Sequence, residues 1–345
     1  MKRGPTSRVP GAFRFRFSFF LWVSLVLFPL AGCAEATPAD LGPLTQEGDR
    51  CGIAAAYPGD RGIANHPSVL FHEDFEHGSA AVLGQRYTSV RNPGNLTFVE
   101  DVPPESAGTL ALRMRSVGGE DTGAHLFRNL PGGHDRLHLR YYVHYDRTHR
   151  YHHTGGGLGG YNPPTPWPQG GAGTRPDGRD RFTVRVEPVG FRPELDIYTY
   201  WPEMRGNPGD ASFWGNTFLG GMRPELPDDR WIAVELMVAL NDPVHASNGE
   251  MALWLDGEPV LHLRPGDPRG TWVWDTFRPG RQGEPFAGFR WRHDPALALT
   301  YLSLSHYVTG HPPGEESHVL WDDVVLATEY IGPIGGSECP APGEV

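Results

Sequence analysis

A short stretch of this chain, residues 152–200, gathers the residue types that could carry out chemistry. It begins with His152 and His153, which are followed by a glycine-rich run. After a loop rich in proline and glycine come two strand-like segments, residues 181–186 and 195–200. Successive side chains of a β-strand point to opposite faces, so each segment presents every second residue to the same surface.

This alternation gives the two segments a shared polar surface. Thr183 and Arg185 lie on one face of the first segment, and Asp196, Tyr198 and Tyr200 lie on one face of the second. An arginine, a hydroxyl group and two phenols beside a histidine pair are suited to an acidic sugar chain, because a guanidinium pairs well with a carboxylate.

The reaction that these side chains fit is β-elimination in a uronate chain. It needs a cation beside the carboxylate, a base for the C5 proton and an acid for the departing O4. Arg185 suits the first task, and His153, with an ordinary pKa near 6.5, suits the second. Tyr198 or Tyr200 suits the third, or serves as base and acid together where an adjacent cation lowers its pKa. We expect Thr183 to orient a sugar hydroxyl.

Non-catalytic interpretations of the same residues stay open. Arg185 could be a solvated charge or the ion-pair partner of Asp196, and tyrosines at alternate strand positions are often simple sheet packing. The glycine run over 155–160 could be a loop that needs positive φ, or a place where a sugar chain approaches the backbone. His152 and His153 are both candidates to face the groove, with His152 as a substrate contact.

The N-terminus has the pattern of a targeting segment. Basic residues over 2–16 precede an apolar run over 17–30, which is shorter than the roughly 20 residues of a membrane span. The run ends in Leu-Ala-Gly-Cys and resembles the lipobox of bacterial lipoproteins. The resemblance implies a signal peptide over 1–32, a lipid on Cys33 and an outer-membrane location, with the lipid as the only membrane contact. The alternative is an ordinary cleaved signal peptide.

The charge balance excludes nucleic acid as a partner. The formal net charge is −11, and loss of the five basic residues in 1–32 makes it −16. Nucleic-acid binders show a basic face instead. An acidic substrate therefore needs local positive charge in its groove. Lys2 is the only lysine, so the mature chain contains none.

Two further cysteines, Cys51 and Cys339, lie near the ends of the folded part. In an exported protein an even pair is typical of a disulfide. A bridge across so long a loop contributes about 4–5 kcal/mol in the chain-entropy model. The alternative is two free thiols.

The rest of the chain indicates one all-β domain. Residues 33–66 have a tether-like composition, residues 67–335 form the domain, and residues 336–345 are a tail. Short alternating runs separated by turn residues are typical of an antiparallel β-sandwich or jelly roll. These runs lie at 69–75, 109–114, 137–145, 181–186, 195–200, 231–240, 250–260, 301–308 and 319–327, and Asp256-Gly257 marks a hairpin.

Several of these segments carry a family resemblance: residues 153–160, 182–185, 198–200, 254–257, 305–307 and 321–325. By their order and spacing the chain resembles the concanavalin-like jelly-roll polysaccharide lyases, a group that includes alginate and glucuronan lyases. The resemblance covers most of residues 70–333. It implies a jelly-roll fold, an acidic polysaccharide as substrate, and substrate contacts from Ser305 and Tyr307.

The departures from that family concern catalysis. The position of the family's catalytic lysine is occupied by His153, and Thr183 stands where the family has serine. An insertion rich in proline and glycine, residues 161–178, separates the first two motifs. The fold is expected to survive these changes, whereas transfer of the catalytic activity is weakened.

No cofactor is expected from ligand spacing, and the histidines near residue 150 have no cysteine or carboxylate cluster at a zinc-binding spacing. A structural Ca²⁺ is the alternative, since this ion takes oxygen ligands. Its ligands would come from Glu73, Asp74 and Glu76 near the first strand and from Asp322 or Asp323 on the last. Ordinary surface carboxylates are the other interpretation.

Three functions follow from these observations. The first is a lipid-anchored polysaccharide lyase, expected to be monomeric, that acts through Arg185, His153, Tyr198 and Tyr200. The second is a non-catalytic carbohydrate-binding envelope lipoprotein in which aromatic rings stack on sugars. The third is a structural envelope protein without a sugar ligand. Trp167, Trp201, Trp214, Trp272, Trp274 and Trp291 are the tryptophans that could line a groove.

Overall fold

The computed structural model describes residues 51–145, 153–190, 192–227 and 229–335, which belong to one compact unit. The signal peptide, Cys33, His152, Cys339 and the C-terminal tail lie outside the described residues. Lipidation, the disulfide and the cellular location therefore stay predictions. Among the described residues, no helix has the length and apolar character needed to cross a membrane.

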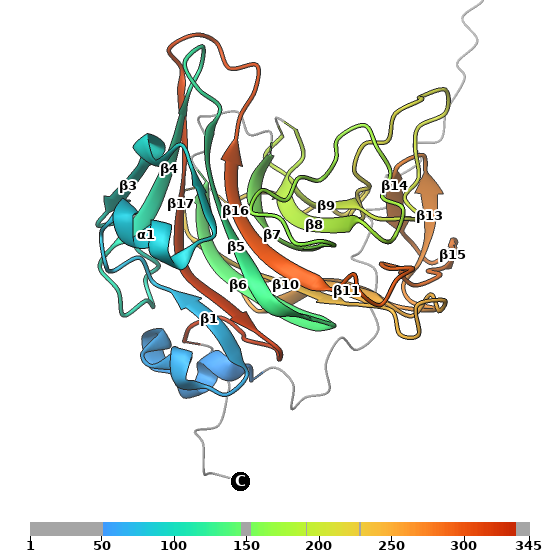
Figure 1. Ribbon diagram of the computed structural model, residues 1–345, viewed down its shortest axis with the longest axis horizontal. Helices are drawn as coiled ribbons and strands as arrows, with labels where there is room; N and C mark the ends of the chain where they lie inside the picture. Colours follow the sequence, from blue (N-terminus) through green and yellow to red (C-terminus); the bar gives the residue numbers. More distant parts are fainter. Residues whose placement is uncertain (1–50, 146–152, 191, 228, 336–345) are drawn as a thin grey trace, which may run out of the picture. The chain divides into compact units, whose positions relative to one another are not determined.

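Two antiparallel sheets form the body of the protein (Figure 1). The larger one, the outer sheet, has the strand order β12-β11-β10-β6-β17-β4-β3, with β1 also paired to β17. Its strands are β1 (Val69–Glu73), β3 (Leu96–Val99), β4 (Ala111–Val117), β6 (Arg136–Tyr145), β10 (Ile232–Ala239), β11 (Glu250–Leu255), β12 (Glu258–Leu263) and β17 (Glu316–Ala327).

The second sheet, the cleft sheet, has the order β2-β5-β16-β7-β8-β9. Its strands are β2 (Ser89–Arg91), β5 (Gly123–His134), β7 (His153–Tyr161), β8 (Arg181–Pro188), β9 (Leu195–Tyr200) and β16 (Leu299–Tyr307). A small third sheet has the order β14-β13-β15, from β13 (Arg269–Val273), β14 (Thr276–Pro279) and β15 (Glu284–Pro285). The helical elements are α1 (Ala80–Arg86) and the 3-10 helices η1 (Ile53–Ala56), η2 (Pro58–Asp60), η3 (Ile63–Asn65) and η4 (Pro93–Asn95).

The hydrophobic core lies between the outer sheet and the cleft sheet. Alternate residues of facing strands enter it, for example Tyr141 from β6, Val184 from β8 and Leu302 from β16. Burial of these side chains is the main stabilising contribution. The arrangement confirms the predicted all-β antiparallel sandwich, and every predicted strand segment coincides with a strand.

One strand differs from its expected structure. The glycine-rich run is not a loop with positive φ but the central part of β7, which is paired with β16 on one side and β8 on the other. None of the glycines over 155–160 has a positive φ. The run is extended because it is held by two neighbouring strands, which outweigh the poor β-propensity of glycine.

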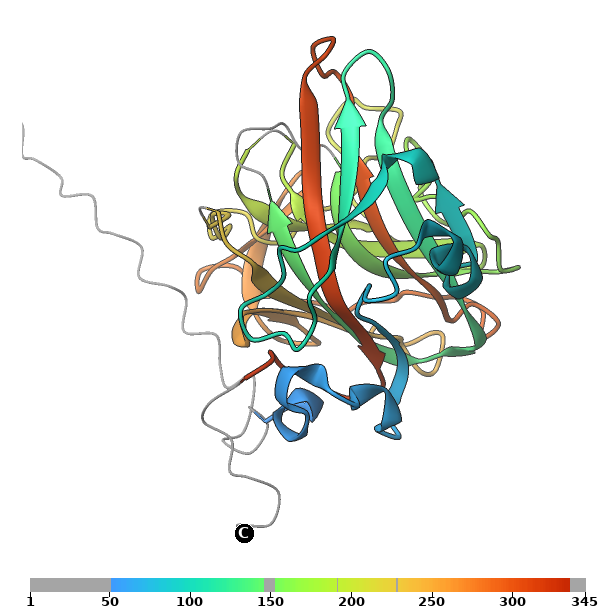
Figure 2. The same cartoon turned by 90° about the vertical axis from the view of Figure 1, so that its left-hand side faces the viewer.

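The segment before β1 also differs from expectation. The predicted tether runs to residue 66, whereas η1, η2 and η3 pack on the outer sheet (Figure 2). Ile63 is fully buried there and contacts the cluster formed by Val325, Ala327 and Ile331. Apolar side chains at Ile53 and Ile63 thus attach this part of the chain to the domain.

Candidate functional site

A cleft of about 660 Å³ lies over the exposed face of the cleft sheet. Its floor is formed by side chains that the strand register places in rows across the sheet. One row runs Tyr198, Arg185, Gly157, Ser303 and Phe127, from β9 through β8, β7 and β16 to β5. The neighbouring row contains Glu187, Ser305 and His125, and in the next row His153 lies opposite Tyr307.

A column of glycines in the middle of the floor determines how the charged residues meet. Gly157 lies between Arg185 on β8 and Ser303 on β16. A Cβ atom there would lie 2.9 Å from Cγ of Arg185 and 2.3 Å from the Val184 carbonyl oxygen. Because that atom is missing, Arg185 crosses the strand and donates hydrogen bonds to Ser303 Oγ (3.1 Å) and to the Gly155 carbonyl (2.8 Å).

A buried carboxylate, Glu187, links the histidine and the arginine. Its Oε1 lies 2.6 Å from His153 Nδ1, and its Oε2 accepts a hydrogen bond of 3.2 Å from Arg185 Nε. Burial alone would raise the pKa of Glu187, but the charges and hydrogen bonds of His153 and Arg185 outweigh burial and lower it. Glu187 is therefore ionised at neutral pH and fixes the orientation of both partners.

The interpretation of Arg185 as the partner of Asp196 is wrong. Asp196 Oδ2 instead accepts a hydrogen bond of 2.7 Å from Arg223 Nε, and its Oδ1 accepts backbone N–H groups of Phe218 and Leu219. These contacts hold the loop after β9 in place. Asp196 thus supports the wall of the cleft, because its acceptor positions are used inside the protein.

The pKa of Glu187 leads to a prediction about stability. Since its folded-state pKa is lowered, its stabilising contribution is complete above its ordinary pKa and is lost as the pH falls below about 4.5. We expect the melting temperature of the wild type to fall more steeply between about pH 6 and pH 3 than that of Glu187→Gln. Thermal unfolding across this range measures the difference. Glu203→Gln, at an exposed carboxylate, should follow the wild type, and identical slopes for all three proteins would contradict the prediction.

Two tyrosines stand beside this charged centre. The hydroxyl groups of Tyr198 and Tyr200 lie 3.2 Å apart, and the ring of Tyr198 lies 5.2 Å from that of His153. Burial raises the pKa of both phenols. The expected tyrosinate base, with a pKa lowered by a cation, therefore does not match this site. Both phenols are protonated at neutral pH and are suited to donate a proton.

The other side of the cleft is aromatic and neutral. His125 packs edge-on against Trp167, and the ring of Tyr307 lies parallel to that of His153 at 6.1 Å. Burial, with the nearby charges of Arg185 and Arg91, lowers the pKa of His125 to about 4. His125 is therefore uncharged at neutral pH and suited to hydrogen-bond a sugar hydroxyl. Ser305 lies in the floor with 2% of its surface exposed.

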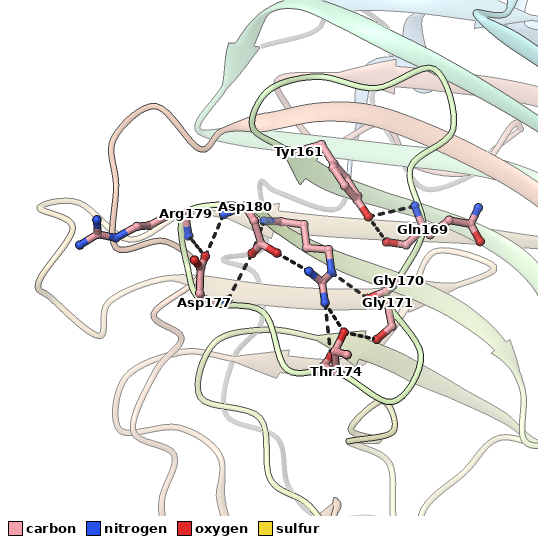
Figure 3. A network of polar contacts seen from close by, with 9 residues as sticks. Tyr161, Gln169, Gly170, Gly171, Thr174, Asp177, Arg179 and Asp180 are labelled. Carbon is pink, nitrogen blue, oxygen red and sulfur yellow. Dashed lines mark hydrogen bonds and ion pairs between the residues drawn. The ribbon is translucent and has the colours of Figure 1, made fainter. Parts of the chain in front are cut away.

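The inserted loop 161–178 forms one wall of the cleft, with Trp167 to Ala172 among the lining residues. Figure 3 shows the polar contacts that hold it. Arg181, at the start of β8, donates to the Gly170 carbonyl (3.3 Å) and to Thr174 Oγ1 (2.7 Å). The Tyr161 hydroxyl contacts the backbone of Gln169. These contacts position Trp167 over the sheet.

Four of the six tryptophans expected in a groove divide into two groups, whereas Trp272, which packs against the core, and Trp274 are not among the lining residues of the cleft. Trp167 and Trp214 line the cleft, and Trp214 is 48% exposed. Trp201 and Trp291 are buried core residues that pack around Phe289, so their expected role in the groove is wrong. The side chains of Trp201 and Trp291 face inward, so their apolar rings are part of the hydrophobic core.

The structure brings most of the predicted site residues together in one cleft: His153, Thr183, Arg185, Tyr198, Tyr200, Ser305 and Tyr307. His152 lies outside the described residues. Glu187, His125 and Ser303 also belong to the site, although the sequence pattern does not predict them. Glu187 follows Arg185 by two positions on the same strand, so its place on the cleft face could have been read from the alternation. No local sequence pattern predicts that His125 belongs to this site. The chemical roles of all these residues stay predictions.

Three of the carboxylates expected to bind calcium, Glu73, Asp74 and Glu76, have partners within the protein. Glu73 pairs with Arg86 (2.6 Å), and Glu76 accepts the backbone N–H groups of Thr109 and Leu110. Asp74 Oδ1 accepts the backbone N–H of Glu76. The remaining members of the predicted set, Asp322 and Asp323, each have one buried oxygen without a hydrogen-bond partner.

Comparisons with known proteins identify the fold. No family model and no curated protein matches this chain. Among solved structures, a marine alginate lyase from Aplysia kurodai superposes with a TM-score of 0.50 and 13% identity, over 76% of this chain and 99% of that one. The alginate lyase vAL-1 from Chlorella virus gives 0.50 and 13%, over 75% and 99%. A mutant of alginate lyase Aly36B in complex with alginate trisaccharide gives 0.50 and 15%, over 76% and 98%. At such low identity the likeness concerns the fold. The chain therefore has the jelly-roll fold of these alginate lyases, which confirms the fold implied by the sequence resemblance.

Proposed function

We propose that this protein is a polysaccharide lyase that cleaves an acidic, uronate-containing polysaccharide in the cleft by β-elimination. The observation that carries the proposal is the ionised Glu187 held between His153 and Arg185, next to two protonated tyrosines. The solved alginate lyases of the same fold, one of them in complex with alginate trisaccharide, support an acidic sugar chain as the ligand.

Arg185 is the cation for the substrate carboxylate in this proposal. A guanidinium has five N–H donors. Within the described residues three of them donate to Glu187, Ser303 and Gly155, so two remain for a ligand. The arginine is held rigidly by these contacts, and a preorganised charge stabilises the negative charge that develops beside the carboxylate.

His153 is the base. Its Nδ1 contact with Glu187 fixes the ring and stabilises the imidazolium that forms when the C5 proton is taken. The electron pair of the broken C5–H bond forms the C4–C5 double bond, and the C4–O4 bond breaks. A tyrosine hydroxyl gives its proton to O4, so a sugar hydroxyl leaves and the new chain end is unsaturated.

Tyr200 is the acid in this scheme. Although burial raises its pKa, the hydrogen bond from Tyr198 acts in the opposite direction, because a hydroxyl that donates to Tyr200 stabilises the phenolate. In that arrangement the proton of Tyr200 is available to the substrate. Tyr198 then acts as a positioning residue.

We expect Tyr200→Phe to lower the elimination rate by about 10²-fold and Tyr198→Phe by about tenfold, within the range for a positioned acid and its supporting hydrogen bond. Initial rates from the absorbance of the unsaturated product measure both effects. Tyr57→Phe, in the segment before β1, is the control and should keep full activity. A larger loss for Tyr198→Phe would exchange the two roles.

The proposal is tested by incubating the purified mature protein with alginate, glucuronan, pectate and glycosaminoglycans. A rise in ultraviolet absorbance from the new double bond with one of them supports the lyase function. The alternative is a non-catalytic carbohydrate-binding protein, favoured by the histidine at the position of the family's catalytic lysine. No absorbance change together with retention on one polymer would establish that alternative.

A further inference from the structure

A second buried polar cluster lies on the face of the outer sheet that turns away from the core. Its members are Asp60 from η2 and His72 from β1, which are near each other in the sequence, and Asp323 from β17, which is distant from both. One donor atom of each, a carboxylate oxygen or an imidazole nitrogen, lies within 4.8 Å of the others. The cleft belongs to the other sheet, so this cluster is separate from the proposed catalytic site.

Each residue of the cluster has one polar side-chain atom without a hydrogen-bond partner. Within the described residues, Asp60 Oδ1, Asp323 Oδ2 and His72 Nε2 are buried and accept or donate no hydrogen bond. Asp60 and Asp323 are each only 2% exposed, so solvent does not replace the missing partners. Buried polar atoms are normally satisfied, and orphaned ones require an explanation such as a bound ion.

The charges of the cluster are also unbalanced. Arg140 is fully buried and pairs with Asp60. Asp322 and Asp323 are two further buried carboxylates, each at most 2% exposed. One arginine compensates one carboxylate, so the group as a whole is short of positive charge.

The backbone supports this arrangement. Asp60 and Asp323 both have positive φ, 59° and 43°. Non-glycine residues adopt this region rarely, and they hold it where the surrounding structure requires a particular side-chain direction. Asp323 lies at an irregularity of β17, where the register of its pairing with β6 shifts between Asp322 and Val325.

We propose that Asp60, His72 and Asp323 bind a divalent transition-metal ion of the zinc class. Imidazole and carboxylate ligands together suit Zn²⁺, whereas Ca²⁺ prefers oxygen ligands alone. The set differs from the calcium ligands expected from the sequence, because it includes a histidine and a residue of the segment before β1. The ion has a structural role: it joins η2 to β1 and β17, and so attaches the segment 51–66 to the outer sheet.

The test uses the full mature chain after dialysis against a chelator. On addition of Zn²⁺ we expect one equivalent of zinc per chain by elemental analysis. We also expect a rise in melting temperature of the order of 5 °C at a hundredfold excess over Kd. His72→Ala and Asp323→Asn should lose both the bound zinc and the rise. His245→Ala, at an exposed histidine outside the cluster, should retain both.

The variant Asp323→Asn tests whether Asp323 is a metal ligand or a residue that only stabilises the fold. Asparagine tolerates positive φ, so the backbone can keep its conformation. In chelator the variant should melt higher than the wild type, because a buried uncompensated charge is removed. In zinc it should melt lower. A variant that melts lower under both conditions, stoichiometric zinc in His72→Ala, or a wild type stabilised by Ca²⁺ but not by Zn²⁺ would each overturn the proposal.

Discussion

Replacing His153 by alanine is expected to lower the elimination rate by about 10³–10⁴-fold, the upper range for a general base. The loss follows from the position of His153 on the cleft floor, where Glu187 holds its Nδ1 at 2.6 Å. No lysine of the mature chain can replace it, since Lys2 is the only lysine and precedes the predicted cleavage site. The rate is measured from the unsaturated product at saturating polymer.

The elimination rate of Glu187→Gln tests the role of the carboxylate that holds His153. Glutamine keeps the shape but not the charge that stabilises the imidazolium, so we expect a smaller loss of about 10–100-fold, typical of a residue that orients a catalytic group. The melting temperature of His153→Ala should fall, because the variant removes one of the two partners of buried Glu187, so the rates are compared at a temperature at which both proteins are folded. His134→Ala, at the end of β5, is the control. Full activity in His153→Ala would place the base elsewhere and remove the basis of the proposed mechanism.

The sequence predicts the fold well where side chains alternate. In β10 large aliphatic residues recur with a period of two, and in β16 Leu302 and Leu304 alternate with Ser303 and Ser305; in both strands the residues of the aliphatic face enter the core. On β8 the same alternation placed Thr183 and Arg185 in the cleft. The prediction ended that strand at Val186, however, and so left out Glu187, which the structure shows to be the centre of the charged group.

The sequence could not predict what depends on tertiary contacts. β7 contains five glycines and has no alternation from which a strand could be recognised. The loop 161–178 has no periodicity, and tertiary contacts such as those with Arg181 and His125 place Trp167 over the sheet. The cluster of Asp60, His72 and Asp323 joins positions separated by most of the chain. Local sequence patterns carry no information about such contacts between residues that are distant in the sequence.

Gly157→Ala is expected to show that the glycine run is part of the site. The new Cβ would lie 2.3 Å from the Val184 carbonyl oxygen and 2.9 Å from Arg185 Cγ, so the strands must separate and the arginine must leave its place over β7. We expect the free energy of unfolding to fall by about 1–3 kcal/mol, the usual effect of overpacking. Elimination should fall by a further factor of at least about ten, because misplaced catalytic groups lose rate steeply.

A double variant distinguishes the steric clash with the Val184 carbonyl oxygen from the clash with Arg185. If Gly157 is needed mainly so that Arg185 can cross to Ser303, then Gly157→Ala combined with Arg185→Ala should be more stable than the sum of the single effects predicts. Urea unfolding of the four proteins measures this coupling. Gly84→Ala is the control, since a Cβ there meets nothing within 4 Å and helix α1 should gain about 0.5–1 kcal/mol. Additive effects would assign the damage to the Val184 backbone alone, and the glycine would then serve strand pairing and not the placement of the arginine.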